Sequence, residues 1–196
     1  MARLGAVGCV LLLLSAPLLA GEATSVRSYP LPGHGTLELT VPSSWKESLS
    51  RPPADLPPTI EFSPDSGSEF VVQVTPIWNP AGDVDPDLGE PETIRGFVEK
   101  LGRRQLDHAV ETEIKLKEIT GPRCRGYFFT ITDRAPAKGE WKYLTAGAVG
   151  VDGLLLSFTI LTNSLHSDDR DRALRMIKQS RYAAAAPSSE GTAGGD

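Results

Sequence analysis

Cysteine and histidine are both scarce in this sequence. The chain has 196 residues but only two cysteines, Cys9 and Cys124, and three histidines, His34, His108 and His166. Cys9 lies at the start of an N-terminal apolar segment, so the rest of the chain holds one cysteine and cannot form an internal disulfide. The histidines stand far apart and match no metal-binding spacing such as HxxxH. We therefore expect a fold held by its hydrophobic core, without disulfides or a histidine-based metal site.

An excess of basic residues is also missing. The formal net charge is −5 at pH 7, which argues against a general nucleic-acid-binding protein. Beyond the N-terminal segment, no apolar run approaches the roughly 20 residues that a membrane-spanning helix needs. We therefore expect neither a nucleic-acid partner nor a membrane span in the mature chain.

The sequence carries no recognisable catalytic pattern. Ser157 and Ser164 lie in no GxSxG turn, and no order of Ser, His and Asp resembles a triad. Cys124 stands between Arg123 and Arg125, and such cations would activate a thiol that they faced. Strand alternation sends both arginine side chains to the opposite face, so we interpret Cys124 as a small buried hydrophobe. These observations predict a protein that is not an enzyme and that has no cofactor.

The N-terminal segment has the pattern of a secretory signal peptide. Arg3 supplies a short positive region, and an apolar stretch runs from Val10 to Ala20. Cleavage after Ala20 and cleavage after Ala23 both fit the small-residue rule. We assign residues 1–23 to the signal peptide and expect a periplasmic or secreted protein.

The clearest folding pattern lies between Cys124 and Leu161. The run CRGYFFTITD is rich in aromatic and β-branched residues, which favour strands. It is followed by the small-residue run YLTAGAVGV and by the nearly continuous apolar run LLLSFTILT. Asp152-Gly153 between the last two runs is typical of a two-residue hairpin turn. We expect three consecutive antiparallel strands here, with both faces covered by other elements.

The rest of the chain predicts further strands and two helices. Strands are expected at 36–41, 59–63, 69–78 and 114–119, and helices are expected from Pro91 and from about Asp168. Residues 24–32 and the turn around Trp45 are expected to be irregular. This pattern indicates an α+β fold: a single antiparallel β-sheet flanked by helices, in one domain over 24–182. The Gly-rich segment 183–196 is expected to be a disordered tail.

The order of elements resembles a known superfamily. The segments LELTVPSSW, GYFFTI and LLLSFTIL, with an amphipathic helix between the first two and a closing helix, are similar to the PsbP-like and DcrB-like proteins. The resemblance covers residues 31–182 and implies an α/β/α sandwich. Members are mostly exported and include a lumenal photosystem subunit, periplasmic proteins and effector chaperones. It implies a binding or assembly factor without catalytic residues, whose partner is another envelope protein.

An acidic loop is the one candidate metal site. Asp83, Asp85 and Asp87 alternate as at the start of a calcium loop, and hard cations bind several oxygens. The pattern then departs from a calcium loop, because Gly89 comes one position late and Ile94 stands where a bidentate Glu is needed. A solvated acidic loop before a helix is therefore the favoured interpretation.

The three tryptophans are the candidate ligand-binding residues. Trp45, Trp78 and Trp141 all fall near the ends of predicted strands or loops, where their rings would line a groove. Packing at the ends of the core is the more common role of such rings and is favoured. The sequence as a whole predicts an exported, non-catalytic binding or assembly factor of the cell envelope. The alternative is a periplasmic small-ligand or metal-binding protein that uses the acidic loop 83–92 or a Trp-lined groove.

Overall fold

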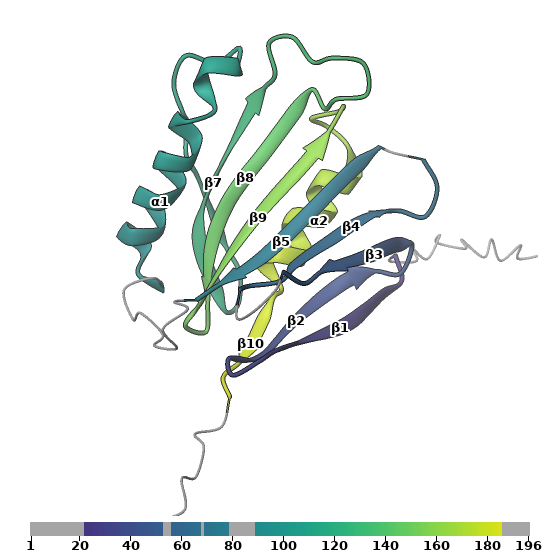
Figure 1. Cartoon of the computed structure of the whole chain (residues 1–196), viewed down its shortest axis with the longest axis vertical. Helices are drawn as coiled ribbons and strands as arrows, with labels where there is room; N and C mark the ends of the chain where they lie inside the picture. Colours follow the sequence, from purple (N-terminus) through teal and green to yellow (C-terminus); the bar gives the residue numbers. More distant parts are fainter. Residues whose placement is uncertain (1–21, 53–55, 68, 79–88, 186–196) are drawn as a thin grey trace, which may run out of the picture.

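The computed structural model describes residues 22–52, 56–67, 69–78 and 89–185, and these residues form two antiparallel sheets and two α-helices (Figure 1). About 48% of the described residues are in strands and 19% in helices. The larger sheet has seven strands in the order β3-β4-β5-β9-β8-β7-β6, and the smaller has the order β1-β2-β10. The strands are β1 (Thr24–Leu31), β2 (Gly35–Pro42), β3 (Trp45–Ser50), β4 (Thr59–Pro64), β5 (Phe70–Ile77), β6 (Lys117–Thr120), β7 (Cys124–Thr132), β8 (Tyr143–Val151), β9 (Leu154–Thr162) and β10 (Arg181–Ala183).

The expectation of a single sheet flanked by helices, as in an α/β/α sandwich, is wrong. The chain forms two sheets and is mostly β. The error arises from β1, β3 and β10, which lie in segments that were expected to be irregular or to begin the tail. β1 contains Pro30 and buries only Tyr29 and Leu31, and β3 is largely polar, so neither shows a strong strand pattern. Both are edge strands, where proline and polar side chains are tolerated.

The three central strands are confirmed. β7 pairs with β8 along its whole length, from Cys124 opposite Val151 to Thr132 opposite Tyr143, and β8 pairs with β9 in the same way. Asp152 and Gly153 form the turn between β8 and β9 with φ angles of 47° and 93°. Positive φ at both positions is the geometry that the Asp-Gly pair predicts. The meander is therefore set by local sequence.

Helix α1 (Pro91–Arg103) covers one side of the larger sheet. It begins at the predicted proline and buries Ile94, Val98 and Gly102 against β7 and β8. Ile94 and Val98 form a core cluster with Phe129, Ala148 and Leu155 among others. Phe97, on the same helix, is 38% exposed.

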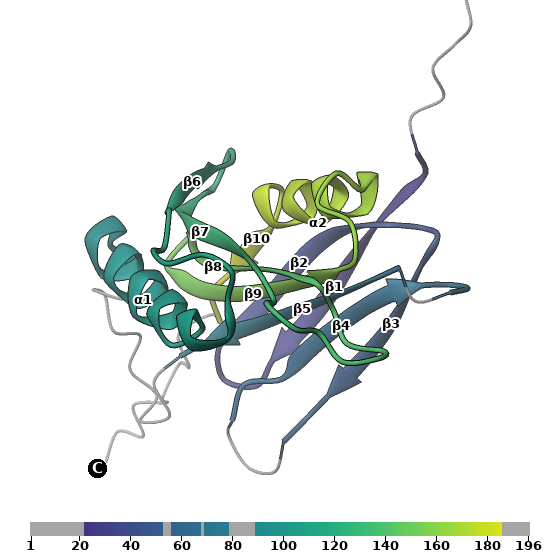
Figure 2. The same cartoon turned by 90° about the horizontal axis from the view of Figure 1, so that it is seen from above.

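The second helix and the small sheet cover the opposite side. Helix α2 (Asp168–Lys178) is capped by Ser167, whose hydroxyl accepts a hydrogen bond from the Arg170 amide. It buries Ala173, Met176 and Ile177 against β2, β5 and β9. Figure 2 shows α1 on one side of the larger sheet, and α2 with β1 and β2 on the other. The larger sheet is thus the middle layer, with a separate hydrophobic cluster on each face.

No helix within the described ranges is both long enough and apolar enough to cross a membrane. The predicted signal peptide falls almost wholly outside these ranges, as do residues 186–196 of the predicted tail. Residues 183–185 are described, and Ala183 is the last residue of β10.

Candidate functional site

Trp45 is a core residue in the structure. It is the first residue of β3 and is 3% exposed. Its ring lies 4.7 Å from that of Phe70 and 6.3 Å from that of Phe62. All three side chains belong to the cluster beneath α2 and the small sheet. Trp45 therefore closes one end of this core, in the packing role that the sequence favoured.

Trp78 closes the other end of the same core. It follows Ile77, the last residue of β5, whereas the Phe70 that contacts Trp45 is the first residue of that strand. The Trp78 ring is 7% exposed and stacks on His34, with ring centroids 4.5 Å apart. Its Nε1 is buried without a hydrogen-bond partner among the described residues. Trp45 and Trp78 are thus separated by the length of β5 and do not share a groove.

Trp141 is the only one of the three that lines one of the cavities found among the described residues. This cavity has a volume of about 240 Å³ and lies at the end of the larger sheet, on the side that α1 covers. Its apolar lining consists of Ile131 on β7, Leu144 on β8 and Leu161 on β9, and the half-buried Trp141 forms one wall. The sheet thus supplies the floor and the loop between β7 and β8 supplies the aromatic wall.

The polar lining of the cavity comes from two other segments. Gln105 and His108 follow α1, and His108 ends the short 3-10 helix η2 (Leu106–His108). Asp133 and Glu140 belong to the loop between β7 and β8. An apolar floor with a few convergent polar groups is the usual character of a binding pocket.

Backbone contacts hold this loop against the segment that follows α1. The Arg134 amide donates to the His108 carbonyl at 2.9 Å, and the Arg134 guanidinium donates to the Ala109 carbonyl at 2.7 Å. Asp133 and Lys142 are joined by a hydrogen bond of 2.8 Å across the base of the loop. The cavity walls are therefore positioned before any ligand arrives, which lowers the entropic cost of binding.

Each carboxylate at the cavity also fixes a turn. Asp133 Oδ1 accepts from the Ala135 amide at 2.8 Å, and Glu140 Oε2 accepts from the Ala137 amide at 2.8 Å. These bonds orient both carboxylates through one oxygen each. Neither carboxylate takes part in an ion pair within the ranges that the structure describes. The described lining of the cavity therefore holds two carboxylates and no lysine or arginine.

A broader surface continues from the cavity along the sheet. Because α1 packs mainly on β7 and β8, most side chains of β5 and β9 on this side are only half-buried, although Leu155 is buried in the cluster that α1 covers. They lie in opposed pairs across the two strands. We call this surface the open face, and its residues are Val71, Gln73, Thr75, Ser157, Thr159 and Leu161. Leu161 belongs to both the open face and the cavity, so the two are continuous.

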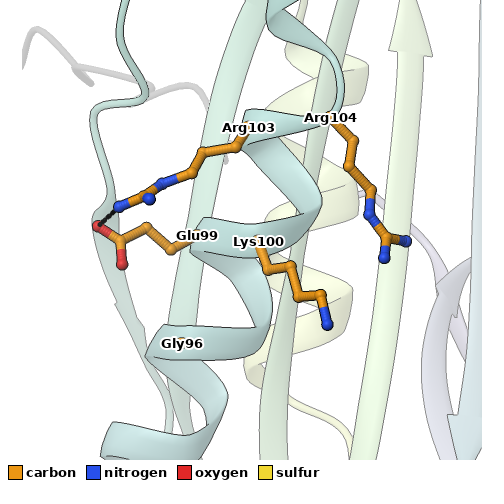
Figure 3. A pocket seen from close by; sticks show the side chains of 5 residues that line it. All are labelled: Gly96, Glu99, Lys100, Arg103 and Arg104. Atoms are coloured by element: carbon orange, nitrogen blue, oxygen red, sulfur yellow. Dashed lines mark ion pairs between the residues drawn. The ribbon is translucent and has the colours of Figure 1, made fainter.

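Other cavities offer weaker sites. Figure 3 shows one of about 380 Å³ whose described lining comes only from α1 and the next residue: Gly96, Glu99, Lys100, Arg103 and Arg104. Arg103 turns toward Glu99, with an ion pair of 3.6 Å, while Lys100 and Arg104 point away from that pair. A single helix face with divergent side chains does not surround a ligand.

A basic cavity lies near the end of α2. It measures about 330 Å³ and is lined by Arg123, Lys178 and Arg181 among others. Arg123 is paired with Asp152 at 3.4 Å, and Lys178 lies in the last turn of α2, where a cation is favoured by the helix dipole. Arg123 and Lys178 thus each have a favourable interaction within the protein, so their positive charges are no evidence for an anionic ligand.

The largest of these cavities, about 500 Å³, includes Cys124 in its lining. The thiol is buried, and its Sγ donates to the carbonyls of Ile177 and Lys178 at 3.6 and 3.5 Å. Burial raises the pKa of Cys124 above its ordinary value. The residue therefore has the character of the inert, buried cysteine that its position predicts.

The predicted metal ligands Asp83, Asp85 and Asp87 lie outside the described residues. Within the described ranges, no group of three or more His, Cys, Asp or Glu side chains is placed to hold a metal ion. His34 stacks on Trp78, His108 lines the Trp141 cavity and His166 is exposed.

Sequence analysis missed Asp133, Glu140 and His108 as members of a site. Trp141 carried a usable signal, since it is a large aromatic residue in a loop. Glu140 stands beside Trp141 in the sequence, but Asp133 lies seven residues before Glu140. Only the folded loop shows that both carboxylates line the same cavity as Trp141.

No protein-family model matches this chain, and no curated protein matches its sequence.

Proposed function

We propose that this protein is an exported, non-catalytic binding protein and that it meets a protein partner on the open face of the larger sheet. The observation that supports the proposal is that, among the described residues, α1 packs on β7 and β8 and leaves the six side chains of the open face only partly buried. Export is inferred from the signal-peptide pattern of residues 1–23.

The composition of the open face supports a protein partner. Charged residues make up 23% of the chain, yet all six residues of the open face are uncharged. Val71 and Leu161 add apolar area at one end of it. Depletion of charge at the centre, with charged groups at the rim, is characteristic of protein interfaces. At the rim, Glu61 on β4 accepts a hydrogen bond of 3.0 Å from Gln73.

The surroundings of Cys124, His34 and His108 among the described residues support a non-catalytic role. Cys124 is buried and its pKa is raised, so it is a poor nucleophile at neutral pH. His34 and His108 lie in different places, one against Trp78 and one at the Trp141 cavity. Binding is therefore the activity best supported by the described residues.

Site-specific photocrosslinking tests this proposal. A photoreactive phenylalanine analogue replaces Thr159 on the open face, and the full chain is expressed in cells that export it. We expect a crosslinked product of one defined mass. The matched control places the same analogue at Arg175, an exposed residue of α2 on the opposite side of the larger sheet.

The outcome is read by comparing the two positions. Crosslinks from Thr159 and not from Arg175 support a partner on the open face. Equal crosslinking from both positions, or none from Thr159 in the exporting cells, would contradict the proposal.

A further inference from the structure

We propose that the Trp141 cavity receives one basic side chain, the guanidinium or ammonium group of an arginine or lysine on the partner. The inference rests on the proposed function, because it specifies what the partner presents where the open face ends. It is argued from the charge, the shape and the lining of the cavity.

The charge of the cavity selects a cation. Asp133 and Glu140 are the acidic residues of its described lining, which contains no lysine or arginine. Of the cations nearest in sequence, Arg134 donates to the Ala109 carbonyl and the Lys142 ammonium lies 5.4 Å from the Tyr143 ring centroid. Lys138, in the same loop, is exposed and does not line the cavity. A ligand that supplies the missing positive charge would form charge-assisted hydrogen bonds with both carboxylates.

The geometry of the carboxylates leaves them able to bind. One oxygen of each accepts a turn N–H, from Ala135 in the case of Asp133 and from Ala137 in the case of Glu140. These bonds hold each carboxylate in place and leave the second oxygen to meet a ligand. A planar guanidinium, with five donors in a fixed fork, can bond to two such oxygens at once.

The apolar part of the cavity fits the stem of the same side chain. Ile131, Leu144 and Leu161 form an apolar floor, and the Trp141 indole forms a wall. Arginine and lysine pair a charged head with an apolar stem, and an indole face attracts a cation. The volume of about 240 Å³ suits one side chain. It lies below the range of roughly 300–1,000 Å³ that is typical of pockets for drug-sized ligands.

The position of the cavity favours a side chain over a free small molecule. Leu161 lies both in the cavity and on the open face, so a partner seated on β5 and β9 would extend to the cavity mouth. A single anchored side chain beside a flatter uncharged surface is a common arrangement at protein interfaces.

The test uses the full mature chain, labelled with ¹⁵N, and follows the three indole N–H signals by NMR. The probe is N-acetyl-arginine methylamide, and its matched neutral control is N-acetyl-citrulline methylamide. A Trp141→Phe variant assigns the Trp141 signal. The signals of Trp45 and Trp78, which are buried in the core, report that each variant is folded.

We expect the arginine probe to shift the Trp141 signal with a dissociation constant of about 1–10 mM, the range for so small a ligand. The citrulline probe should bind at least about fivefold more weakly. Asp133→Asn and Glu140→Gln keep an acceptor oxygen for their turns and remove the charge. Each should weaken arginine binding about two- to fivefold, as for a partly exposed ion pair. Glu118→Gln, on β6 opposite Tyr127 and outside the cavity lining, should leave it unchanged.

Equal binding of arginine and citrulline probes would overturn the inference, because the cavity would then recognise shape without charge. The absence of any shift at Trp141 would overturn it as well. Neither result affects the crosslinks from Thr159, so a failure of this inference is distinguishable from a failure of the proposed function.

Discussion

The hydroxyl of Tyr29 on β1 donates a hydrogen bond of 2.7 Å to the carboxylate of Glu47 on β3, and this bond joins the two sheets. The same Glu47 oxygen accepts from the Arg27 guanidinium at 3.0 Å, and Arg27 also donates to the Trp45 carbonyl at 2.9 Å. Three polar side chains therefore fasten the small sheet to the edge of the large one. The contact thus joins β1 to β3, the two edge strands that the sequence pattern did not predict.

Removal of the Tyr29 hydroxyl should weaken the joint between the sheets. Tyr29 is 5% exposed, so Tyr29→Phe removes a largely buried hydrogen bond to a charged acceptor. We expect the free energy of unfolding to fall by about 1.5–3 kcal/mol. Urea denaturation measures the change. Tyr143→Phe, at a half-buried tyrosine on β8, is the control and should change stability by less than about 0.5 kcal/mol.

The same tyrosine should make the fold sensitive to alkaline pH. Burial, followed by the hydrogen bond to Glu47, raises the pKa of Tyr29 above its ordinary value of 10. The unfolded chain then loses its proton first, so stability is complete below pH 10 and declines above it, by up to about 1.4 kcal/mol per pH unit for one proton. Urea midpoints measured across this range should decline less steeply in Tyr29→Phe than in the natural chain. If the urea midpoints of the two proteins declined equally with pH, Tyr29 would not be the source of the alkaline sensitivity.

Two glycine substitutions should have opposite effects. At Gly121, a Cβ would collide with the Lys178 carbonyl oxygen and come within 3.0 Å of the Cys124 sulfur. Gly121→Ala should therefore destabilise the protein by about 1–3 kcal/mol. At Gly96, in the exposed part of α1, a Cβ meets no atom within 4 Å among those described. Gly96→Ala should stabilise by about 0.5–1 kcal/mol, because alanine loses less backbone entropy in a helix. Thermal melting measures both changes: the melting temperature should fall for Gly121→Ala and rise for Gly96→Ala.

Cys124 should resist alkylation in the folded protein. The thiol is 4% exposed and burial raises its pKa, so little thiolate meets solvent at neutral pH. Iodoacetamide labelling followed by intact-mass measurement should show an unmodified chain in buffer and one adduct in concentrated urea. Fast labelling in buffer would show that the segment joining Cys124 to the end of α2 opens readily.

The contacts of Glu22 favour one of the two predicted signal-peptide cleavage positions. Glu22 forms an ion pair of 2.9 Å with Arg172 of α2 and accepts a hydrogen bond from Ser44, and the Ala23 carbonyl accepts from the Ser43 amide. Cleavage after Ala20 keeps all of these contacts, whereas cleavage after Ala23 removes them. We expect the exported protein to begin at Gly21. Intact-mass measurement of the exported chain checks this, and a mass beginning at Thr24 would contradict it.

The sequence alone determined the parts of the fold that depend on neighbouring residues. Tyr127, Phe129 and Ile131 alternate along β7, Asp152-Gly153 sets the hairpin turn, and Pro91 sets the start of α1. Each is a local pattern of period or backbone angle, and such patterns do not need a partner segment to be recognised. The resemblance to the PsbP-like and DcrB-like proteins stays a prediction.

Only the tertiary structure decided the number of sheets and the place of the candidate site. β1 and β3 are strands because β2 and β4 supply their hydrogen-bond partners, and their own polar sequences give no such signal. The three tryptophans look alike in sequence, yet Trp45 and Trp78 close one core while Trp141 lines a cavity on the opposite side of the sheet. Asp133 and Trp141 meet because the loop between β7 and β8 folds back on itself. Contacts between segments distant in the chain cannot be read from local periodicity, and they locate the proposed binding surface.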